Sequence, residues 1–225
     1  MPTKAYVITL PDEASQEQAK ALQASANIDI EIFPATTEED VVKEFKARRI
    51  KWNYPWSTGV LDIQTGLFKS PYETKVPQRR MACFMSHYRL WEKALKEPIF
   101  VFEQDAIFVR PFSEVEVANT GFDIVSLNDP RGATRRAQAY HELIREHVVT
   151  EAPWLDDQRI PQGLPGNSAY YITPDGAQKL HKLVERYGAW PNDAIMCKQL
   201  MRKKLGCLGN YVTSLQENHV STTTK

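Results

Sequence analysis

The most apolar segment of the chain, residues 99–109, contains two carboxylates one residue apart, Glu103 and Asp105. Alternate residues of a strand share a face, so both acids are expected to point one way and Gln104 the other. Paired oxygen ligands suit Mg²⁺ or Mn²⁺, ions that are often shared with substrate phosphates. Acidic pairs are also common by chance, but ligands of open α/β sheets gather at the carboxyl ends of strands. We therefore expect a metal site at Glu103 and Asp105.

A third acid, Asp193, follows Pro191 at the start of a helical segment. There it is either a simple first-turn acid or a general base that removes the proton from an attacking hydroxyl group. Ser86 and His87 lie on an apolar helical face, where they either serve the core or border a substrate site, with Arg80 in reach of a phosphate. No Ser or Cys occupies a strand-to-helix elbow beside an ordered base, which argues against a nucleophilic triad.

Alternating strand and helix patterns predict the scaffold that positions these residues. Strands are expected at 5–10, 28–33, 99–109, 122–127 and 168–172, and helices at 12–25, 37–51, 80–95, 173–184 and from 192 onward. Asp12 and Thr173 are expected to cap two of the helices. The opening strand–helix–strand unit is typical of parallel sheets.

Two segments lack a clear period. Residues 52–77 are rich in Trp, Tyr, Pro and Gly and predict a long surface loop. Its aromatic residues either pack on a base or sugar ring or tie the loop to the core; they are Trp52, Tyr54, Trp56 and Tyr72. Residues 131–157 are charged and mostly helical in propensity.

Composition indicates an ordinary globular protein, with no reason to expect a polyanion partner. The hydrophobic fraction of 42% supports a sizeable core in 225 residues, and the net charge of zero gives no general attraction to polyanions. The basic residues form four clusters, at 46–51, 79–80, 131–136 and 202–204, each a solvated face or a phosphate contact. Three cysteines without metal-ligand spacing favour a reducing compartment.

The start of the chain resembles neither a signal peptide nor a membrane anchor. No stretch approaches the roughly 20 apolar residues that a membrane span needs. We expect a cytoplasmic protein of a prokaryotic or virus-infected cell, with work at a membrane surface left open.

Several motifs, in matching order, resemble those of glycosyltransferase family 25, the lipopolysaccharide and collagen galactosyltransferase group. The central pair is Ala82-Cys83-Phe84-Met85-Ser86-His87 with Trp91, followed by Phe102-Glu103-Gln104-Asp105-Ala106. The remaining motifs are Tyr6 to Leu10, Gly166 to Pro174 with Gly176, Ala177 and Leu180, Pro191-Asn192-Asp193, and Leu215-Gln216 with Ser221. Together they touch nearly the whole chain.

The resemblance implies a single GT-A-like α/β domain over residues 1–225, with a Rossmann-like central mixed sheet flanked by helices. It divides the domain into a nucleotide-sugar-binding part, 1–130, and an acceptor-side part, 131–225. It implies inverting transfer from a UDP-sugar to a hydroxyl group, with Mn²⁺ or Mg²⁺ as cofactor and a glycan or lipid-linked acceptor. The implied catalytic residues are Asp193 and Asp105, the metal ligands Glu103 and Asp105, and the donor-site residues Thr9, Arg80, Ser86, His87, Glu103 and Gln104.

Two departures from the family pattern leave alternatives open. Gln104 replaces the middle acid of a common Glu-Asp-Asp, and Thr9-Leu10-Pro11-Asp12 replaces a usual Asn-Leu with a following Arg. The first change weakens the metal site if the middle residue is a ligand. The alternatives are a phage-type enzyme that glycosylates a hydroxymethylated DNA base and a non-catalytic nucleotide-sugar-binding or scaffold protein.

Overall fold

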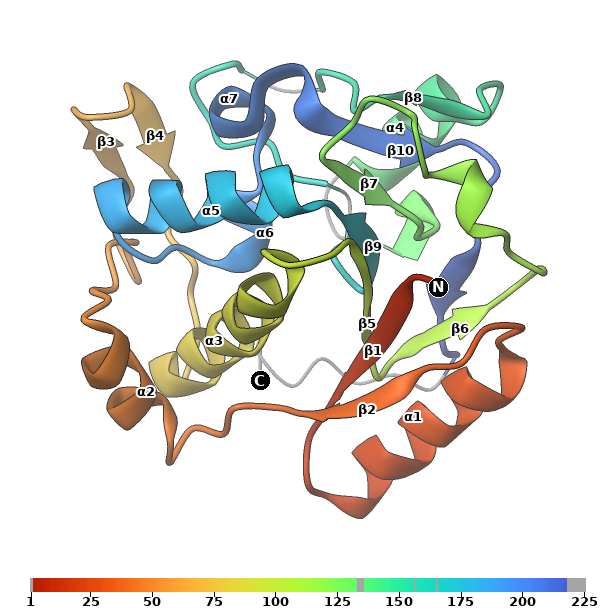
Figure 1. Cartoon of the computed structure of the whole chain (residues 1–225). Coiled ribbons are helices and arrows are strands. Elements are labelled where there is room, and N and C mark those ends of the chain that lie inside the picture. The colour runs from red at the N-terminus through yellow and green to blue at the C-terminus, as the bar shows by residue number, and fades with distance from the viewer. Residues whose placement is uncertain (1, 133–135, 156, 165, 218–225) are drawn as a thin grey trace.

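The structure, a computed structural model, describes residues 2–132, 136–155, 157–164 and 166–217. A seven-stranded mixed sheet runs through its centre in the order β2-β1-β5-β9-β7-β10-β8 (Figure 1). These strands are β1 (Lys4–Thr9), β2 (Glu31–Pro34), β5 (Ile99–Glu103), β7 (Ile124–Ser126), β8 (Val149–Glu151), β9 (Ala169–Ile172) and β10 (Leu205–Leu208). Two-stranded sheets form from β3 (Val60–Asp62) with β4 (Leu67–Lys69) and from β6 (Ala106–Phe108) with β11 (Thr213–Leu215).

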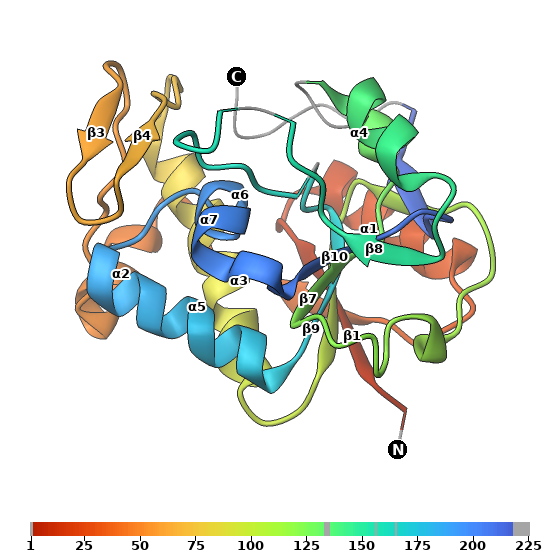
Figure 2. The same ribbon diagram turned by 90° about the horizontal axis from the view of Figure 1, so that it is seen from above.

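Helices cover both faces of the central sheet, as expected. They are α1 (Glu13–Ser25), α2 (Val41–Arg48), α3 (Pro77–Ala94), α4 (Ala137–Ile144), α5 (Pro174–Tyr187), α6 (Asn192–Ile195) and α7 (Lys198–Met201). Short 3-10 turns lie at Glu114–Glu116, Pro130–Gly132 and Arg202–Lys204. Seen from above, α3 and α5 lie on one side of the sheet and α1 on the other (Figure 2). The larger core packs β1 residues Tyr6 and Ile8 against the α3 side, and the smaller core packs Ala5 and Val7 against the α1 side.

The opening unit confirms the predicted parallel arrangement. β1 pairs in parallel with β2 on one edge and with β5 on the other. Asp12 caps α1 by accepting a hydrogen bond from the Ser15 amide at 2.9 Å, and Thr173 caps α5 by accepting one from Gly176 at 3.2 Å. β9 then runs antiparallel between β5 and β7, which makes the sheet mixed.

The structure corrects three of the predicted segments. The expected strand at 99–109 is two strands in different sheets, because the chain turns at Gln104 and Asp105. The expected loop at 52–77 contains the β3–β4 hairpin. Residues 131–157 were expected to be mostly helical, but in their described part the eight-residue α4 is followed by the strand β8. The predicted basic residue Arg135 and the motif residue Ser221 lie outside the described residues.

The central sheet draws strands from both proposed parts of the domain, because β8, β9 and β10 lie after residue 130. Within the described part of the chain, no helix combines the length and the apolar character that crossing a bilayer requires.

Candidate active site

The predicted acids meet where β5 ends. Glu103 is the last residue of β5, lies opposite Ile8 of β1, and donates its amide to the Ser168 carbonyl at 2.8 Å. Asp105 follows in the turn to β6, where its carbonyl accepts a hydrogen bond from the Gln216 amide at 2.8 Å. The turn, rather than strand alternation, therefore sets the position of the second acid.

Gln104 points away from the two acids, toward the start of α1. Its Oε1 accepts a hydrogen bond from the Leu10 amide at 2.9 Å, and its Nε2 donates to Ser15 Oγ at 2.6 Å. Ser15 Oγ already donates its own hydrogen to Asp12 at 2.7 Å, so it can only accept from residue 104. An ionised Asp or Glu at position 104 would place an oxygen without a proton against Ser15 Oγ, which can only accept a hydrogen bond here. The structure thus explains the Gln as a tie between turn and helix, and places no amide atom on the metal side.

Glu103 and Asp105 have the properties of a cation site. The Asp105 Oδ1 atom is buried without a hydrogen-bond partner, an arrangement that carries a cost unless a ligand completes it. Burial, followed by the charge of Glu103, raises the pKa of Asp105 to about 7. A hard divalent cation would offset both the burial and the mutual repulsion of the two carboxylates. The residues present therefore fit Mg²⁺ or Mn²⁺.

A buried chain of hydrogen bonds holds Glu103 in place. Trp91 Nε1 donates to the Tyr170 hydroxyl at 3.0 Å, which leaves that hydroxyl to donate to His87 Nδ1 at 2.9 Å. His87 Nε2, carrying the proton, then donates to Glu103 Oε1 at 3.0 Å. Since indole N–H is only a donor, this direction satisfies every group and assigns the Nε2–H tautomer to His87. His87 is thus a core histidine that also orients a proposed metal ligand.

Removal of the Tyr170 hydroxyl should weaken metal binding more than it slows turnover. In Tyr170→Phe, Trp91 and His87 lose their partner and Glu103 loses its fixed orientation, so the metal concentration for half-maximal activity should rise about 10- to 100-fold. The rate at saturating metal should fall much less. The matched control is Tyr171→Phe, because Tyr171 packs against Phe100 in the other core. Equal metal dependence in the two variants would contradict the positioning role.

Cys83 stands at the centre of the site. Its Sγ lies 3.6 Å from Asn192 Oδ1, and its ligand atom lies within 4.8 Å of those of His87 and Glu103. This trio has the geometry to bind a soft metal ion. Burial, however, raises the pKa of the Cys83 thiol well above its ordinary value, which keeps it protonated and a poor ligand. The two carboxylates therefore stay the predicted ligands of a hard cation.

Asp193 approaches the same space from α6. Its Oδ2 accepts a hydrogen bond from the Tyr72 hydroxyl at 3.1 Å, whereas its buried Oδ1 has no partner. The Arg80 guanidinium lies 3.8 Å from the centre of the Tyr72 ring. Burial is the main cause that raises the pKa of Asp193; the Arg80 charge opposes this shift, and the Glu103 charge adds to it. Asp193 is thus a first-turn acid of α6 whose remaining oxygen has no hydrogen-bond partner, and its role as a base stays a prediction.

Two predicted donor-site residues have structural partners of their own. The Ser86 hydroxyl donates to the Ala82 carbonyl and accepts from the Thr36 amide, each at 2.9 Å. The Thr9 hydroxyl donates to the Val7 carbonyl at 3.2 Å. Both residues lie near the ends of β1 and β2, but their contact with a donor stays a prediction.

Asn167 is a site residue that the sequence analysis did not single out. Both polar atoms of its amide are buried without a hydrogen-bond partner. It immediately precedes Ser168, whose carbonyl binds the Glu103 amide, so it lies at the same edge of the sheet as the two acids. Its signal was present in the Gly166-to-Pro174 motif, but a single Asn within a turn carries no chemistry by itself.

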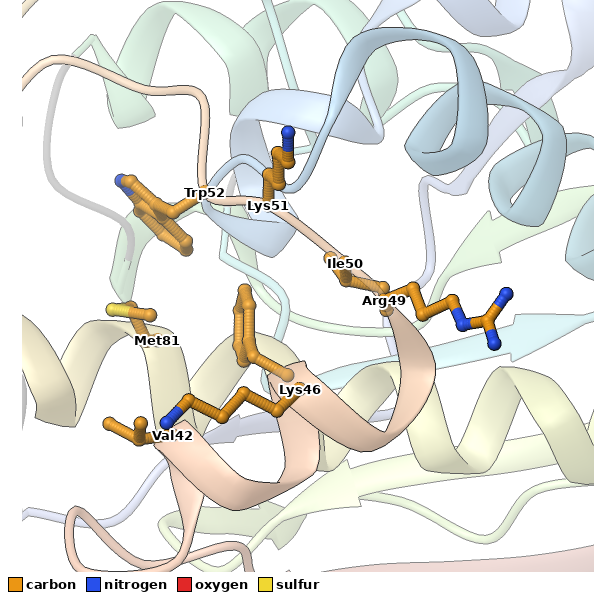
Figure 3. A pocket seen from close by; sticks show the side chains of 8 residues that line it. Val42, Lys46, Arg49, Ile50, Lys51, Trp52 and Met81 are labelled. Carbon is orange, nitrogen blue, oxygen red and sulfur yellow. The ribbon is translucent and has the colours of Figure 1, made fainter.

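The aromatic residues of segment 52–77 contact the rest of the domain, and their packing on a base or sugar ring stays a prediction. Tyr54 is buried against Trp190 and ties the segment to the core, whereas Tyr72 reaches Asp193. Trp52 and Trp56 stack in parallel at 4.9 Å. Trp52 also closes a surface pocket of about 340 Å³ between α2 and α3 (Figure 3).

A family comparison decides the class of this protein. Residues 2–196 match the model of glycosyltransferase family 25, described as an LPS biosynthesis protein. The chain belongs to glycosyltransferase family 25. Membership of this family supports a glycosyltransferase over the non-catalytic scaffold. A search of the curated proteins found no significant match.

Solved glycosyltransferases are similar at low identity. GlyE of Streptococcus pneumoniae TIGR4 is 12% identical with a TM-score of 0.41, and the match covers 92% of this chain and 45% of that one. An active-site mutant of LgtC is 8% identical with a TM-score of 0.47, covering 96% and 88%. Mouse xyloside xylosyltransferase 1 is 12% identical with a TM-score of 0.38, covering 88% and 67%. The chain thus spans less than half of GlyE.

Proposed function

We propose that this family 25 enzyme transfers a sugar from a UDP-sugar to a hydroxyl group of a glycan or lipopolysaccharide-type acceptor. The transfer inverts the anomeric carbon and depends on Mn²⁺ or Mg²⁺. The observation that carries the proposal is the meeting of acids around Cys83. Its Sγ lies within 4.8 Å of a Glu103 oxygen and 3.6 Å from Oδ1 of Asn192, the neighbour of Asp193, and Asp105 follows Glu103 by two residues. Two of these acids keep a buried oxygen without a partner.

Glu103 and Asp105 would hold the cation, which when bound neutralises the negative charge that develops on the leaving diphosphate. Arg80 supplies a fixed positive charge to the same site, because it acts electrostatically on both Cys83 and Asp193. The open amide of Asn167 is available for a sugar or phosphate oxygen. These contacts would orient the donor before transfer.

Asp193 serves as the general base. It takes the proton of the acceptor hydroxyl while that oxygen forms a bond to the anomeric carbon, and the bond from this carbon to the diphosphate breaks. UDP leaves with the electron pair, and no covalent enzyme intermediate forms. Asp193 comes from the proposed acceptor-side part, 131–225, and the metal-binding acids come from the proposed donor part, 1–130, which supports that division.

The acceptor class rests on two considerations. The family description names lipopolysaccharide biosynthesis, which favours a glycan. For the DNA alternative, each of the four predicted basic clusters is partly neutralised by an ion pair. The pairs are Arg48 with Glu44, Arg79 with Glu38, Arg131 with Asp129, and Lys204 with Asp123. No contact in the described part of the chain favours a base over a sugar as acceptor.

The test is UDP release from a panel of UDP-sugars with Mn²⁺, with Mg²⁺ and with a chelator. Release from one donor that needs the cation, and that a glycan acceptor accelerates, is the expected result. Release at the same rate in chelator contradicts metal dependence, and acceleration by hydroxymethylated DNA alone contradicts the glycan acceptor.

A further inference from the structure

We propose that the β3–β4 hairpin and the basic residues beside α2 form a docking surface for an anionic lipid bilayer. This inference is independent of the proposed donor and acceptor. It rests on three observations: the exposed apolar tip of the hairpin, the unpaired cations near its base, and the position of both at one edge of the molecule.

The hairpin projects apolar side chains into solvent. Ile63 at its tip is 93% exposed, and Leu61, Val60 and Phe68 are exposed as well. The one carboxylate in this stretch, Asp62, is turned inward and paired with Lys69. The exposed part of the hairpin is therefore uncharged and rich in apolar side chains, although Gln64 in the turn is an exposed polar residue.

The hairpin is held firmly at its base. Lys69 Nζ also donates to the Asn53 carbonyl at 2.8 Å, and the Phe68 amide donates to the Arg159 carbonyl at 2.7 Å. Gly66, with φ of 71°, makes the turn without the strain of a side chain. Such anchoring keeps the apolar tip outside the fold rather than allowing it to collapse onto the core.

Three cations lie near that base. Lys46, Arg49 and Lys51 line the pocket between α2 and α3, and the Arg49 and Lys51 side chains extend away from its apolar floor (Figure 3). Among the described residues, none of the three has a carboxylate partner, whereas neighbouring Arg48 is paired with Glu44 and Glu92. The pocket lining contains no acid. The lining of this pocket is thus positively charged although the whole chain is neutral.

Hairpin and cations share one edge of the molecule. The hairpin and α2 both lie on the left of the molecule in Figures 1 and 2, and Figure 1 shows the hairpin at the upper end of that side and α2 at its lower end. Asn53 connects them, because it bonds Lys69 and follows Lys51 by two residues. An anionic bilayer fits both features, since acidic headgroups attract Lys and Arg while apolar side chains enter the interface.

A bilayer suits this surface better than a second copy of the chain. A stable protein interface uses roughly 20–30 residues on each side, whereas the hairpin presents four apolar side chains on a narrow projection. Short apolar tips of this kind need no complementary partner surface in a lipid interface.

The test is co-sedimentation of the full chain with vesicles of phosphatidylcholine alone or of equal parts phosphatidylcholine and phosphatidylglycerol. We expect binding to the anionic vesicles that falls with added salt. The double variant Leu61→Ser/Ile63→Ser should lose at least about tenfold in partitioning. Each charge removed in Lys46→Gln, Arg49→Gln and Lys51→Gln should lose about fivefold.

Two matched controls and one second readout make the result decisive. Val148→Ser removes a comparably exposed apolar residue, 76% exposed, outside the hairpin, and Lys203→Gln removes an exposed cation outside the cluster; both should bind as the native chain does. UDP release in solution should be unchanged in every variant, so failure here leaves the transferase untouched. Absent vesicle binding, or binding that the hairpin variant retains, overturns the proposal. So does a dimer that Ile63→Ser dissociates without any vesicle binding.

Discussion

Asp105→Ala should abolish metal-dependent sugar transfer, with a loss of about a thousandfold or more in kcat/KM. Asp105 is the acid that a bound cation would stabilise most, because its buried Oδ1 has no hydrogen-bond partner and its pKa is raised to about 7. Without it, Glu103 alone would hold the ion, and the leaving diphosphate would lose most of its charge neutralisation. Turnover over a range of Mn²⁺ concentrations measures the effect.

Asp105 should also affect how the stability of the metal-free protein depends on pH. A carboxyl group whose folded pKa exceeds its unfolded value favours the folded state when protonated, so its stabilising effect is lost as pH rises from about 4 through about 7. Asp105→Asn should therefore raise the Tm of the metal-free protein relative to wild type at pH above about 7, and much less below about 4. Mn²⁺ should stabilise wild type and not the variant.

Exposed Asp29 provides the control for both measurements. Asp29→Ala and Asp29→Asn should leave turnover, metal dependence and Tm close to wild type. Near-normal metal-dependent turnover in Asp105→Ala would remove this residue from the metal site.

Asp193→Asn should lower kcat about a hundred- to ten-thousandfold while leaving binding of UDP with metal nearly unchanged. The amide keeps the size of the side chain and its bond to the Tyr72 hydroxyl, but it cannot accept the acceptor proton. The control is Asp175→Asn, which changes an exposed acid in the first turn of α5. A normal kcat in Asp193→Asn would contradict the assignment of the base.

The pH dependence gives an independent check on Asp193. A base must be ionised, so activity falls as pH drops through its pKa, which burial raises above the ordinary carboxyl range. The acidic limb of the pH profile of kcat/KM should therefore lie at a higher pH than the titration of an ordinary carboxyl group. Tyr72→Phe removes a hydrogen bond that lowers this pKa, so the limb should move to still higher pH.

Local signals in the sequence predicted the elements that depend on neighbouring residues. The β1–α1–β2 unit, the Asp12 and Thr173 caps and helix α3 follow from short-range hydrogen bonds and helical spacing. The β3–β4 hairpin was missed because β3 is largely exposed and the buried face of β4 combines Leu67 with Lys69, so no apolar alternation marks it. The break at Gln104 was missed because an apolar run does not show where a chain changes sheets.

The residues of the candidate site were also predictable only where a local signal marked them. Glu103, Asp105 and Asp193 carry chemistry by residue type and were identifiable, whereas the alternation argument that paired the first two was wrong in detail. The role of Tyr170 in orienting His87, and the open amide of Asn167, depend on partners far apart in the chain. Only the fold brings those residues together.

Calorimetric titration of UDP into the protein, with and without Mn²⁺, tests the central claim most directly. The account predicts tight UDP binding that requires Mn²⁺, is lost in Asp105→Ala and persists in Asp193→Asn. UDP binding of equal strength without the cation, or unaffected by Asp105→Ala, would contradict a metal-held diphosphate at Glu103 and Asp105.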